Sequence, residues 1–331
     1  MIRRYCNLAF VLAGLMFFVL PECYAPLVYR PGEGWSYEPV GGGRWERTRA
    51  KDQLQVAQEA FAKKDYRLAL KAARRVVKRW PYSDYAPEAQ YLIGRCYEAR
   101  HMDEKAFKEY QTLLEKYPKV DMYQEVIKRQ FAIANRFLAG QWFRVLFGYI
   151  PLYPSMEKTC GLFEKIIKNG PYSQEGIQSQ MNIGKAREKQ KKWDDAVKAY
   201  EKAADRYHDY KQVAADALFN AGLALNKEAK KSDYDQSIAQ KAINTFSDFI
   251  TLNPEDPRVN EAREFIKLLK TEQARGSFNI AQYYESKKKW SGALVYYNDV
   301  IIKDPDSKYA TIAREKIQSI KATQQKAAQH K

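Results

Sequence analysis

The sequence predicts an all-α fold: a right-handed solenoid of about six helical hairpins, closed by a C-terminal capping helix. The prediction rests on a set of small and aromatic residues that recurs four times at offsets of 12, 4 and 8 residues, in a chain with little strand character. A fixed spacing of this kind is typical of stacked helical hairpins. The four sets are Ala57, Ala69, Ala73 and Pro81; Gly94, Ala106, Tyr110 and Pro118; Gly184, Ala196, Tyr200 and His208; and Ala281, Ala293, Tyr297 and Pro305.

Each residue type has a place in such a hairpin. Gly or Ala permits the two helices to approach closely, and in three sets an aromatic residue four positions after the second small residue fills the adjacent gap on the same helical face. Proline ends the unit because it cannot continue a helix. Ser83, Ser173 and Ser307 each follow a proline by two residues, so we expect them to cap the next helix.

Two further hairpins carry insertions. The hairpin that begins at Ala134 holds an apolar insertion at about 140–154, and the hairpin that begins at Gly222 holds a polar one at about 227–237. A closing helix is expected over Tyr309–Thr323. The predicted domains are a signal peptide (1–25), an extended tether rich in Pro, Gly and aromatic residues (26–49), the solenoid (50–323) and a polar basic tail (324–331).

The N-terminus predicts export. Arg3 and Arg4 precede an uninterrupted apolar run, Leu8–Leu20, which suits a signal peptide and is too short to span a bilayer. Cleavage after Ala25 is one expected outcome, whereas a segment that stayed uncleaved would indicate a cytosolic adaptor. The prolines and Gly41–Gly43 of the following segment favour an extended tether, with an ordinary disordered N-terminus as the alternative.

Composition argues against several classes of function. The net charge of +16 comes from Lys and Arg dispersed beside Asp and Glu, which indicates a solvated repeat surface, or attraction to acidic partners or anionic head groups, and does not favour nucleic acid. No histidine has metal ligands at suitable spacing, and no phosphate-binding or nucleophile motif occurs. The sequence therefore predicts neither catalysis nor a cofactor. Cys96 and Cys160 are expected to be buried helix thiols, with a disulfide between them as the alternative.

The apolar insertion is larger than a turn between two helices requires. Three interpretations remain open: a flap packed back on the solenoid, a patch for a partner protein, and a wedge at a lipid surface. The candidate partner-patch residues are Trp142, Phe143, Phe147 and Tyr149.

A peptide groove is expected on the concave face, which the first helix of each hairpin lines. Its exposed positions lie six and three residues before, and one and four after, the first small residue. A mixture of aromatic, amide and charged groups at these positions suits an extended or carboxylate-ended peptide. Leu54, Phe131 and Leu138 occupy such positions too and equally fit packing between repeats. The candidate groove residues are Gln58, Phe61, Tyr91, Arg95, Glu98 and Asn135.

Two features carry a family resemblance. The 37-residue period from Ala57 to Gly94, with Pro-x-Ser between repeats, resembles the periplasmic tetratricopeptide proteins of Gram-negative envelopes. The C-terminal part, where Glu261–Ile266 leads into Phe278–Tyr284 and then Lys289–Leu294, is similar to the last repeat of the BamD (ComL/YfiO-like) family of outer-membrane assembly lipoproteins.

The BamD resemblance implies a non-enzymatic scaffold at the periplasmic face of the outer membrane. It implies two kinds of partner, the periplasmic domains of the barrel-assembly channel and nascent outer-membrane β-barrel proteins. It also implies a lipidated cysteine, for which Cys23 is the candidate, although the preceding Leu20-Pro21-Glu22 departs from the usual lipobox. The alternative is an envelope or cell-division adaptor that resembles CpoB (YbgF-like). Such chains usually carry a coiled coil before their repeats, and no heptad run precedes Lys51.

Overall fold

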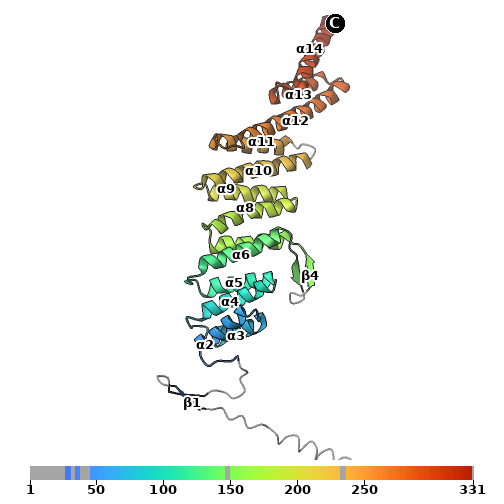
Figure 1. Cartoon of the computed structure of the whole chain (residues 1–331). Helices are drawn as coiled ribbons and strands as arrows, with labels where there is room; N and C mark the ends of the chain where they lie inside the picture. The colour runs from blue at the N-terminus through green and yellow to red at the C-terminus, as the bar shows by residue number, and fades with distance from the viewer. Residues whose placement is uncertain (1–26, 31–33, 38–44, 146–149, 232–235, 330–331) are drawn as a thin grey trace, which may run out of the picture. The chain divides into compact units, whose positions relative to one another are not determined.

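The computed structural model describes residues 27–30, 34–37, 45–145, 150–231 and 236–329. Within these ranges the chain forms thirteen helices and two short antiparallel β-hairpins, which confirms the predicted all-α class (Figure 1). The chain divides after Asp121 into two compact units. Both units are built from helical hairpins whose consecutive helices pack side by side.

The first unit holds two helical hairpins, preceded by a β-hairpin in the segment expected to be an extended tether. In that β-hairpin, Leu27 lies opposite Tyr37 and Arg30 opposite Gly34. The helical hairpins are α2 with α3 and α4 with α5. The elements are β1 (Leu27–Arg30), β2 (Gly34–Tyr37), α2 (Ala50–Ala62), α3 (Tyr66–Arg79), α4 (Ala86–Ala99) and α5 (Asp103–Lys116).

The second unit holds four helical hairpins and the closing helix α14. Its hairpins are α6 with α7, α8 with α9, α10 with α11, and α12 with α13, and α14 packs on α13. The elements are α6 (Tyr123–Leu138), β3 (Phe143–Val145), β4 (Ile150–Tyr153), α7 (Met156–Asn169), α8 (Gln174–Lys189), α9 (Trp193–Arg206), α10 (Lys211–Lys231), α11 (Gln236–Leu252), α12 (Val259–Ser286), α13 (Trp290–Lys303) and α14 (Lys308–Gln329).

The two insertions take different forms. The apolar insertion contains β3 and β4, an antiparallel pair between α6 and α7. The polar insertion instead lengthens α10, which runs on to Lys231 before α11 begins at Gln236. Its Lys-Glu-Ala-Lys-Lys sequence, residues 227–231, consists of strong helix formers, so the first helix of that hairpin simply continues.

In three hairpins the recurrent small residue lies directly beneath an aromatic ring of the second helix. A methyl group added at Gly94 or Gly184 would overlap the ring of Tyr110 or Tyr200, and one added at Gly222 would lie 2.6 Å from Cε1 of Phe246. The three rings are fully buried. The aromatic residue therefore packs on the small residue itself, and the two helices of the hairpin meet at this contact.

The turns inside the hairpins repeat one backbone conformation. Lys64, His101, Lys191 and Lys288 each lie seven residues after the first small residue of their set, and their φ values are 60°, 54°, 58° and 56°. Only a few per cent of non-glycine residues adopt this left-handed region. The following amide closes each helix by donating across the turn; in the first hairpin, for example, the N–H of Asp65 donates to the carbonyl of Ala60 at 2.9 Å.

Hydrogen bonds between hairpins also recur. The hydroxyl of Tyr117 donates to the carbonyl of Pro81 at 2.9 Å, and that of Tyr207 donates to the carbonyl of Pro171 at 2.8 Å. Each bond fixes the end of one hairpin to the loop that closes the hairpin before it. The loops are thereby held in place by side chains 36 residues further along the chain.

Two of the three predicted serine caps are present. The hydroxyl of Ser173 accepts from the N–H of Gly176 at 3.0 Å, and that of Ser307 accepts from the N–H of Ala310 at 3.2 Å. The prediction was wrong for Ser83, whose hydroxyl donates to the carbonyl of Trp80 at 2.9 Å and does not cap α4.

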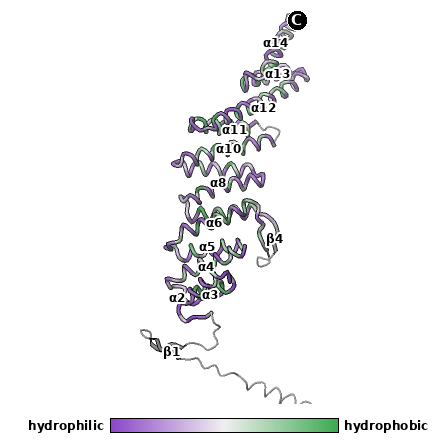
Figure 2. The backbone as a smooth tube through the Cα atoms, in the orientation of Figure 1, coloured by the Kyte–Doolittle hydropathy of each residue, from purple (hydrophilic) through white to green (hydrophobic). Residues whose placement is uncertain are grey.

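The core follows the apolar faces of the helices, as the alternation of hydrophobic and hydrophilic residues along each helix in Figure 2 indicates. In the second unit, α12 is one continuous helix of 28 residues. Leu269 and the residues before it pack in one core cluster, whereas Ala274 and later residues pack in another. Cys96 and Cys160 are free and buried, and burial raises the pKa of each thiol to about 11.

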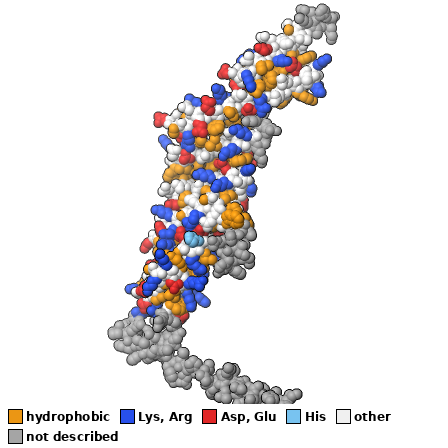
Figure 3. All heavy atoms as spheres, turned by 45° about the vertical axis from the view of Figure 1, so that its right-hand side comes forward, with side chains coloured by type: hydrophobic (Ala, Val, Ile, Leu, Met, Phe, Trp, Pro, Cys, Tyr) orange, Lys and Arg blue, Asp and Glu red, His pale blue; other side chains and the backbone are white. Residues whose placement is uncertain are grey.

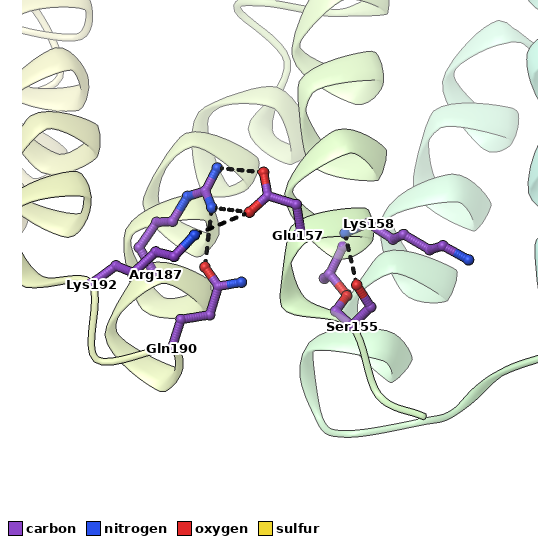
Figure 4. A network of polar contacts seen from close by, with 7 residues as sticks. Ser155, Glu157, Lys158, Arg187, Gln190 and Lys192 are labelled. Atoms are coloured by element: carbon purple, nitrogen blue, oxygen red, sulfur yellow. Dashed lines mark hydrogen bonds and ion pairs between the residues drawn. The ribbon is translucent and has the colours of Figure 1, made fainter. Parts of the chain in front are cut away.

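A polar network joins α7 to α8 at the surface of the second unit (Figure 4). The guanidinium of Arg187 donates to both oxygens of Glu157, at 3.0 Å for Oε1, and Lys192 approaches the same carboxylate at 3.6 Å. The hydrogen bonds from Arg187 lower the pKa of Glu157 to about 2. Because the Glu157 side chain is 62% exposed, we expect this network to orient the two helices and to add little to the free energy of unfolding.

The ring-on-glycine contact makes a direct prediction. Gly94→Ala places a methyl group in steric overlap with the ring of Tyr110, which is fully buried, so we expect the free energy of unfolding to fall by about 1–3 kcal/mol. Gly161→Ala is the matched control, because nothing lies within 4 Å of its Cβ position in α7. There the helix propensity of alanine should raise stability by roughly 0.5–1 kcal/mol. Denaturant unfolding measures both, and equal effects at the two sites would contradict the packing described here.

Candidate peptide-binding surface

Three of the predicted groove residues form one cluster on the first helices of the first unit. Phe61 lies near the end of α2, and Tyr91 and Arg95 lie one turn apart on α4. The guanidinium carbon of Arg95 is 5.3 Å from the ring centre of Phe61 and 5.8 Å from that of Tyr91. All three side chains are half-buried, so each keeps a face toward solvent. The Phe61–Tyr91–Arg95 cluster is the candidate binding surface.

The charge of Arg95 is held by aromatic rings and not by a carboxylate. Its Nη1 lies 3.4 Å from the hydroxyl of Tyr91, which is a long hydrogen bond. No Asp or Glu among the described residues forms an ion pair with Arg95. Cation–π contacts orient a guanidinium without neutralising it. The cluster therefore presents an oriented positive charge beside apolar surface, which can bind an anionic group next to an apolar one.

Gln58 lies on the same pair of helices but is already paired. Its amide nitrogen donates to Oε1 of Glu88 on α4 at 2.6 Å, and the Gln58 side chain is exposed. This bond links α2 to α4. Gln58 can thus contact a ligand only at the edge of the cluster, or after its hydrogen bond to Glu88 is broken.

Glu98 accepts a hydrogen bond within its own hairpin. Oε2 of Glu98 accepts from the hydroxyl of Tyr110 at 2.9 Å, so the carboxylate is bound from inside its own repeat. The same bond recurs from Tyr200 to Glu188 at 2.7 Å and from Tyr297 to Glu285 at 2.5 Å. Burial and the hydrogen bond to the carboxylate raise the pKa of both Tyr200 and Tyr297, which keeps these hydroxyls protonated as donors. The glutamates four residues after the small residue are therefore structural acceptors.

Asn135 belongs to the second unit and has a partner there. Its Oδ1 accepts from Nδ2 of Asn182 at 2.8 Å, which links α6 to α8. Leu54 is 3% exposed and packs in the core, which agrees with the interpretation that this residue packs between repeats and does not line the groove. The half-buried ring of Phe131 meets Phe163 edge-on, with the ring centres 6.1 Å apart.

The predicted partner patch is only partly described. Phe143 is 2% exposed and stacks on Phe137 with ring centres 4.1 Å apart, so it packs on the hairpin and cannot contact a partner. Trp142, by contrast, is 52% exposed. Phe147, Tyr149 and the possible lipidation site Cys23 lie outside the described residues.

Sequence reasoning missed a buried glutamine four residues before the small residue. In α4, Nε2 of Gln90 donates to the carbonyl of Glu109 at 3.2 Å, and in α8, Nε2 of Gln180 donates to the carbonyl of Ala199 at 3.0 Å. A glutamine at the same offset in four repeats was the sequence signal that could have revealed this role. The four glutamines at this offset are Gln53, Gln90, Gln130 and Gln180.

In the first repeat this glutamine binds the segment that leads into α2. Nε2 of Gln53 donates to the carbonyl of Trp45 at 3.1 Å, and its Oε1 accepts from the N–H of Arg47 at 2.8 Å. The ammonium of Lys71 lies 4.3 Å from the ring centre of Trp45. The last residues of the expected tether are therefore fixed on the first hairpin.

Among the residues that the structure describes, no group of three or more His, Cys, Asp or Glu is placed to hold a metal ion. In the same part of the chain, no helix combines the length and apolarity that crossing a bilayer requires.

The structural role of Glu98 can be separated from a role in binding. Glu98→Ala removes the acceptor of the buried Tyr110 hydroxyl, and we expect the free energy of unfolding to fall by about 1–3 kcal/mol. Glu88→Ala is the control, since it removes a carboxylate whose partner Gln58 is exposed, and should change stability by about 0.5 kcal/mol or less. Urea titration compares the two. A Glu98→Ala variant as stable as the parent would return this residue to the list of groove candidates.

Several solved structures are similar to the chain at low sequence identity. MamA from Desulfovibrio magneticus RS-1 is 15% identical to the chain, with a TM-score of 0.31, and the match covers 64% of this chain and 98% of that one. The C-terminal part of a tetratricopeptide protein from Cytophaga hutchinsonii is 14% identical, with a TM-score of 0.35 and coverages of 81% and 88%. YrrB, described as a tetratricopeptide protein with an unusual peptide-binding site, is 13% identical, with a TM-score of 0.33 and coverages of 65% and 92%. No curated protein matches the chain.

Two family models match the sequence. Residues 54–121, which include the Phe61–Tyr91–Arg95 cluster, match a tetratricopeptide-repeat model. Residues 155–331, more than half of the chain, match the model described as YfiO, outer membrane lipoprotein. The helical hairpins of both units, with their recurrent ring-on-glycine contacts, are the architecture on which these matches fall. The chain therefore belongs to the YfiO family of outer membrane lipoproteins and is a protein-binding scaffold of the tetratricopeptide type.

Proposed function

We propose that the chain is a non-enzymatic periplasmic scaffold that binds partner proteins and nascent outer-membrane β-barrel proteins during their assembly into the outer membrane. Membership of the YfiO family supports an envelope protein with protein partners. The apolar run Leu8–Leu20 behind Arg3 and Arg4 supports export. The partners would be the periplasmic domains of the barrel-assembly channel and the unfolded barrel chains themselves.

The proposed binding site rests on the guanidinium of Arg95, which the rings of Phe61 and Tyr91 orient and which has no carboxylate partner among the described residues. A carboxylate can accept two parallel hydrogen bonds from a guanidinium, and such charge-assisted bonds are about twice as strong as neutral ones. The two rings offer apolar contact within reach of the same charge. A peptide that ends in an apolar or aromatic residue with a free carboxylate has both complementary groups. In this proposal, the first unit binds the C-terminal segment of a barrel protein.

Charge reversal at the cluster tests this binding mode. Arg95→Glu should weaken binding of barrel-derived C-terminal peptides at least about tenfold, because a charge-assisted bond is replaced by repulsion. The loss should be larger at low salt, since an exposed charge contact is screened as ionic strength rises. Fluorescence anisotropy of a labelled peptide at two salt concentrations measures both effects, and circular dichroism checks the fold.

Two controls sharpen the measurement. Arg263→Glu makes the same charge change at an exposed position of α12 and should leave peptide affinity unchanged. A peptide with an amidated C-terminus should bind the parent weakly and be insensitive to Arg95→Glu. Equal affinity of the parent and Arg95→Glu for the free-acid peptide would rule out this surface. Loss of affinity together with loss of helicity would instead make Arg95 a structural residue.

The N-terminus tests the proposed location. We expect a mature species that begins between residues 23 and 26 and is recovered in the envelope fraction. Intact-mass measurement distinguishes the two routes: a diacylglycerol adduct on Cys23 indicates a lipoprotein, and an unmodified terminus at Pro26 indicates simple secretion. Recovery of the full-length chain in the cytosol would contradict the envelope assignment.

A further inference from the structure

The second helix of the first hairpin differs in charge from its counterparts in the other five hairpins. Helix α3 carries six Lys or Arg residues and no Asp or Glu in its 14 residues. The corresponding helices are nearly neutral. Helices α5 and α9 each carry three basic and four acidic residues, and α7 carries three basic and two acidic residues. Helices α11 and α13 each carry one basic and one acidic residue. Their net charges thus lie between −1 and +1, against +6 for α3. The dispersal of charge expected from the whole sequence does not hold for this helix.

The cations of α3 lie on the face that points away from the core. Arg67, Lys71, Arg74 and Lys78 are all exposed, and their spacing of four, three and four residues places them on one side of the helix. At a rise of about 1.5 Å per residue, the stripe is roughly 16 Å long. The opposite face is buried and consists of Ala69, Leu70, Ala72, Ala73 and Val76. In Figure 3, blue Lys and Arg side chains stand out over the surface of the first unit.

Little negative charge within the unit balances this stripe. Among the six cations of α3, the one ion pair that joins described residues runs from Arg75 to Glu46 at 3.5 Å. Arg74 donates to the hydroxyl of Tyr97, and Lys71 lies over the ring of Trp45, so both have neutral partners. Arg67 and Lys78 form no hydrogen bond or ion pair with any described residue.

We propose that this basic stripe, Arg67, Lys71, Arg74 and Lys78, docks the first unit on anionic lipid head groups at a membrane surface. The four long, flexible side chains lie in a line along an exposed helix face. Such an arrangement suits a membrane surface, whose anionic head groups can move to meet each cation, better than a folded acidic protein, whose carboxylates have fixed positions. Each basic residue near an anionic bilayer adds to the attraction, which acts within a Debye length. Trp45, held beneath Lys71, is an amphipathic side chain of the kind that collects at head-group level. The proposal does not depend on the peptide site, which uses α2 and α4.

Vesicle flotation of the full chain tests the docking. The probes are phosphatidylcholine vesicles with and without phosphatidylglycerol, and the readout is the ratio of binding to the two, because any acyl anchor contributes equally to both. We expect the parent to favour anionic vesicles and to lose this preference at high salt. The triple variant Arg67→Gln, Lys71→Gln, Lys78→Gln should lower binding to anionic vesicles at least about tenfold. These positions leave the contacts of Arg74 and Arg75 intact.

The matched control removes the same charge elsewhere. Lys165→Gln, Lys168→Gln, Lys198→Gln changes exposed lysines on α7 and α9 and should retain the binding of the parent. A second variant that keeps the charge, Arg67→Lys with Lys78→Arg, should also bind as the parent does, and it covers the case in which the triple variant fails to fold. Arg95→Glu should still bind vesicles, and the triple variant should still bind peptide, so failure of one proposal is distinguishable from failure of the other.

Three outcomes would overturn the proposal. The first is a parent that binds both kinds of vesicle equally. The second is an equal loss of binding in the triple variant and in the control, which would mean that net charge alone is responsible. The third is a parent that binds an acidic polypeptide, poly-glutamate, through the α3 stripe and does not prefer anionic vesicles, which would assign the stripe to an acidic protein partner.

Discussion

The contact of an aromatic ring with the small residue of the preceding helix is the constraint on which three hairpins depend, α4 with α5, α8 with α9 and α10 with α11. At Gly94, Gly184 and Gly222 the ring occupies the space that a methyl group would need, so the distance between the two helices is set by one pair of residues. In two of these repeats the tyrosine hydroxyl then binds a glutamate on the first helix. Where Phe246 replaces tyrosine, the residue at the glutamate position is Asn226, which is buried and whose Oδ1 has no hydrogen-bond partner among the described residues. The ring type and the residue at the glutamate position thus change together: the tyrosines pair with glutamates, and the phenylalanine, which has no hydroxyl, occurs with an asparagine.

The repeat spacing predicted the hairpins, and an offset from the small residue fixed which face of a helix each candidate groove residue occupies. Phe61, Tyr91 and Arg95 were selected in this way, and the structure brings them together. That they bind a peptide stays a prediction. The bond between Glu98 and Tyr110 was not predicted because Tyr110 lies on another helix, although a glutamate at the same offset in three repeats was a visible signal. Phe143 was misassigned because composition cannot tell on which side of an inserted strand a residue packs.

The first unit holds positive charge in two different arrangements. Arg95 is held between rings on the first helices, so its orientation is restricted and it suits recognition of one group in one geometry. The cations of α3 project from the second helix with few fixed partners, so they suit a diffuse attraction that needs no register. The net charge of the whole chain conceals this difference, because most other helices carry both signs. Comparing equivalent helices of successive repeats reveals it.

The packing of this chain has a consequence for the order in which it folds. Each strongly packed pair of helices consists of neighbours, or next neighbours, along the sequence. In such arrays folding can nucleate in any repeat and spread to the adjacent one, and contacts that are local in sequence form quickly. A hairpin such as α4 with α5 therefore makes its contacts within itself and with the adjacent helices. The N-terminal repeats can therefore begin to fold before the C-terminal repeats have been synthesised or exported.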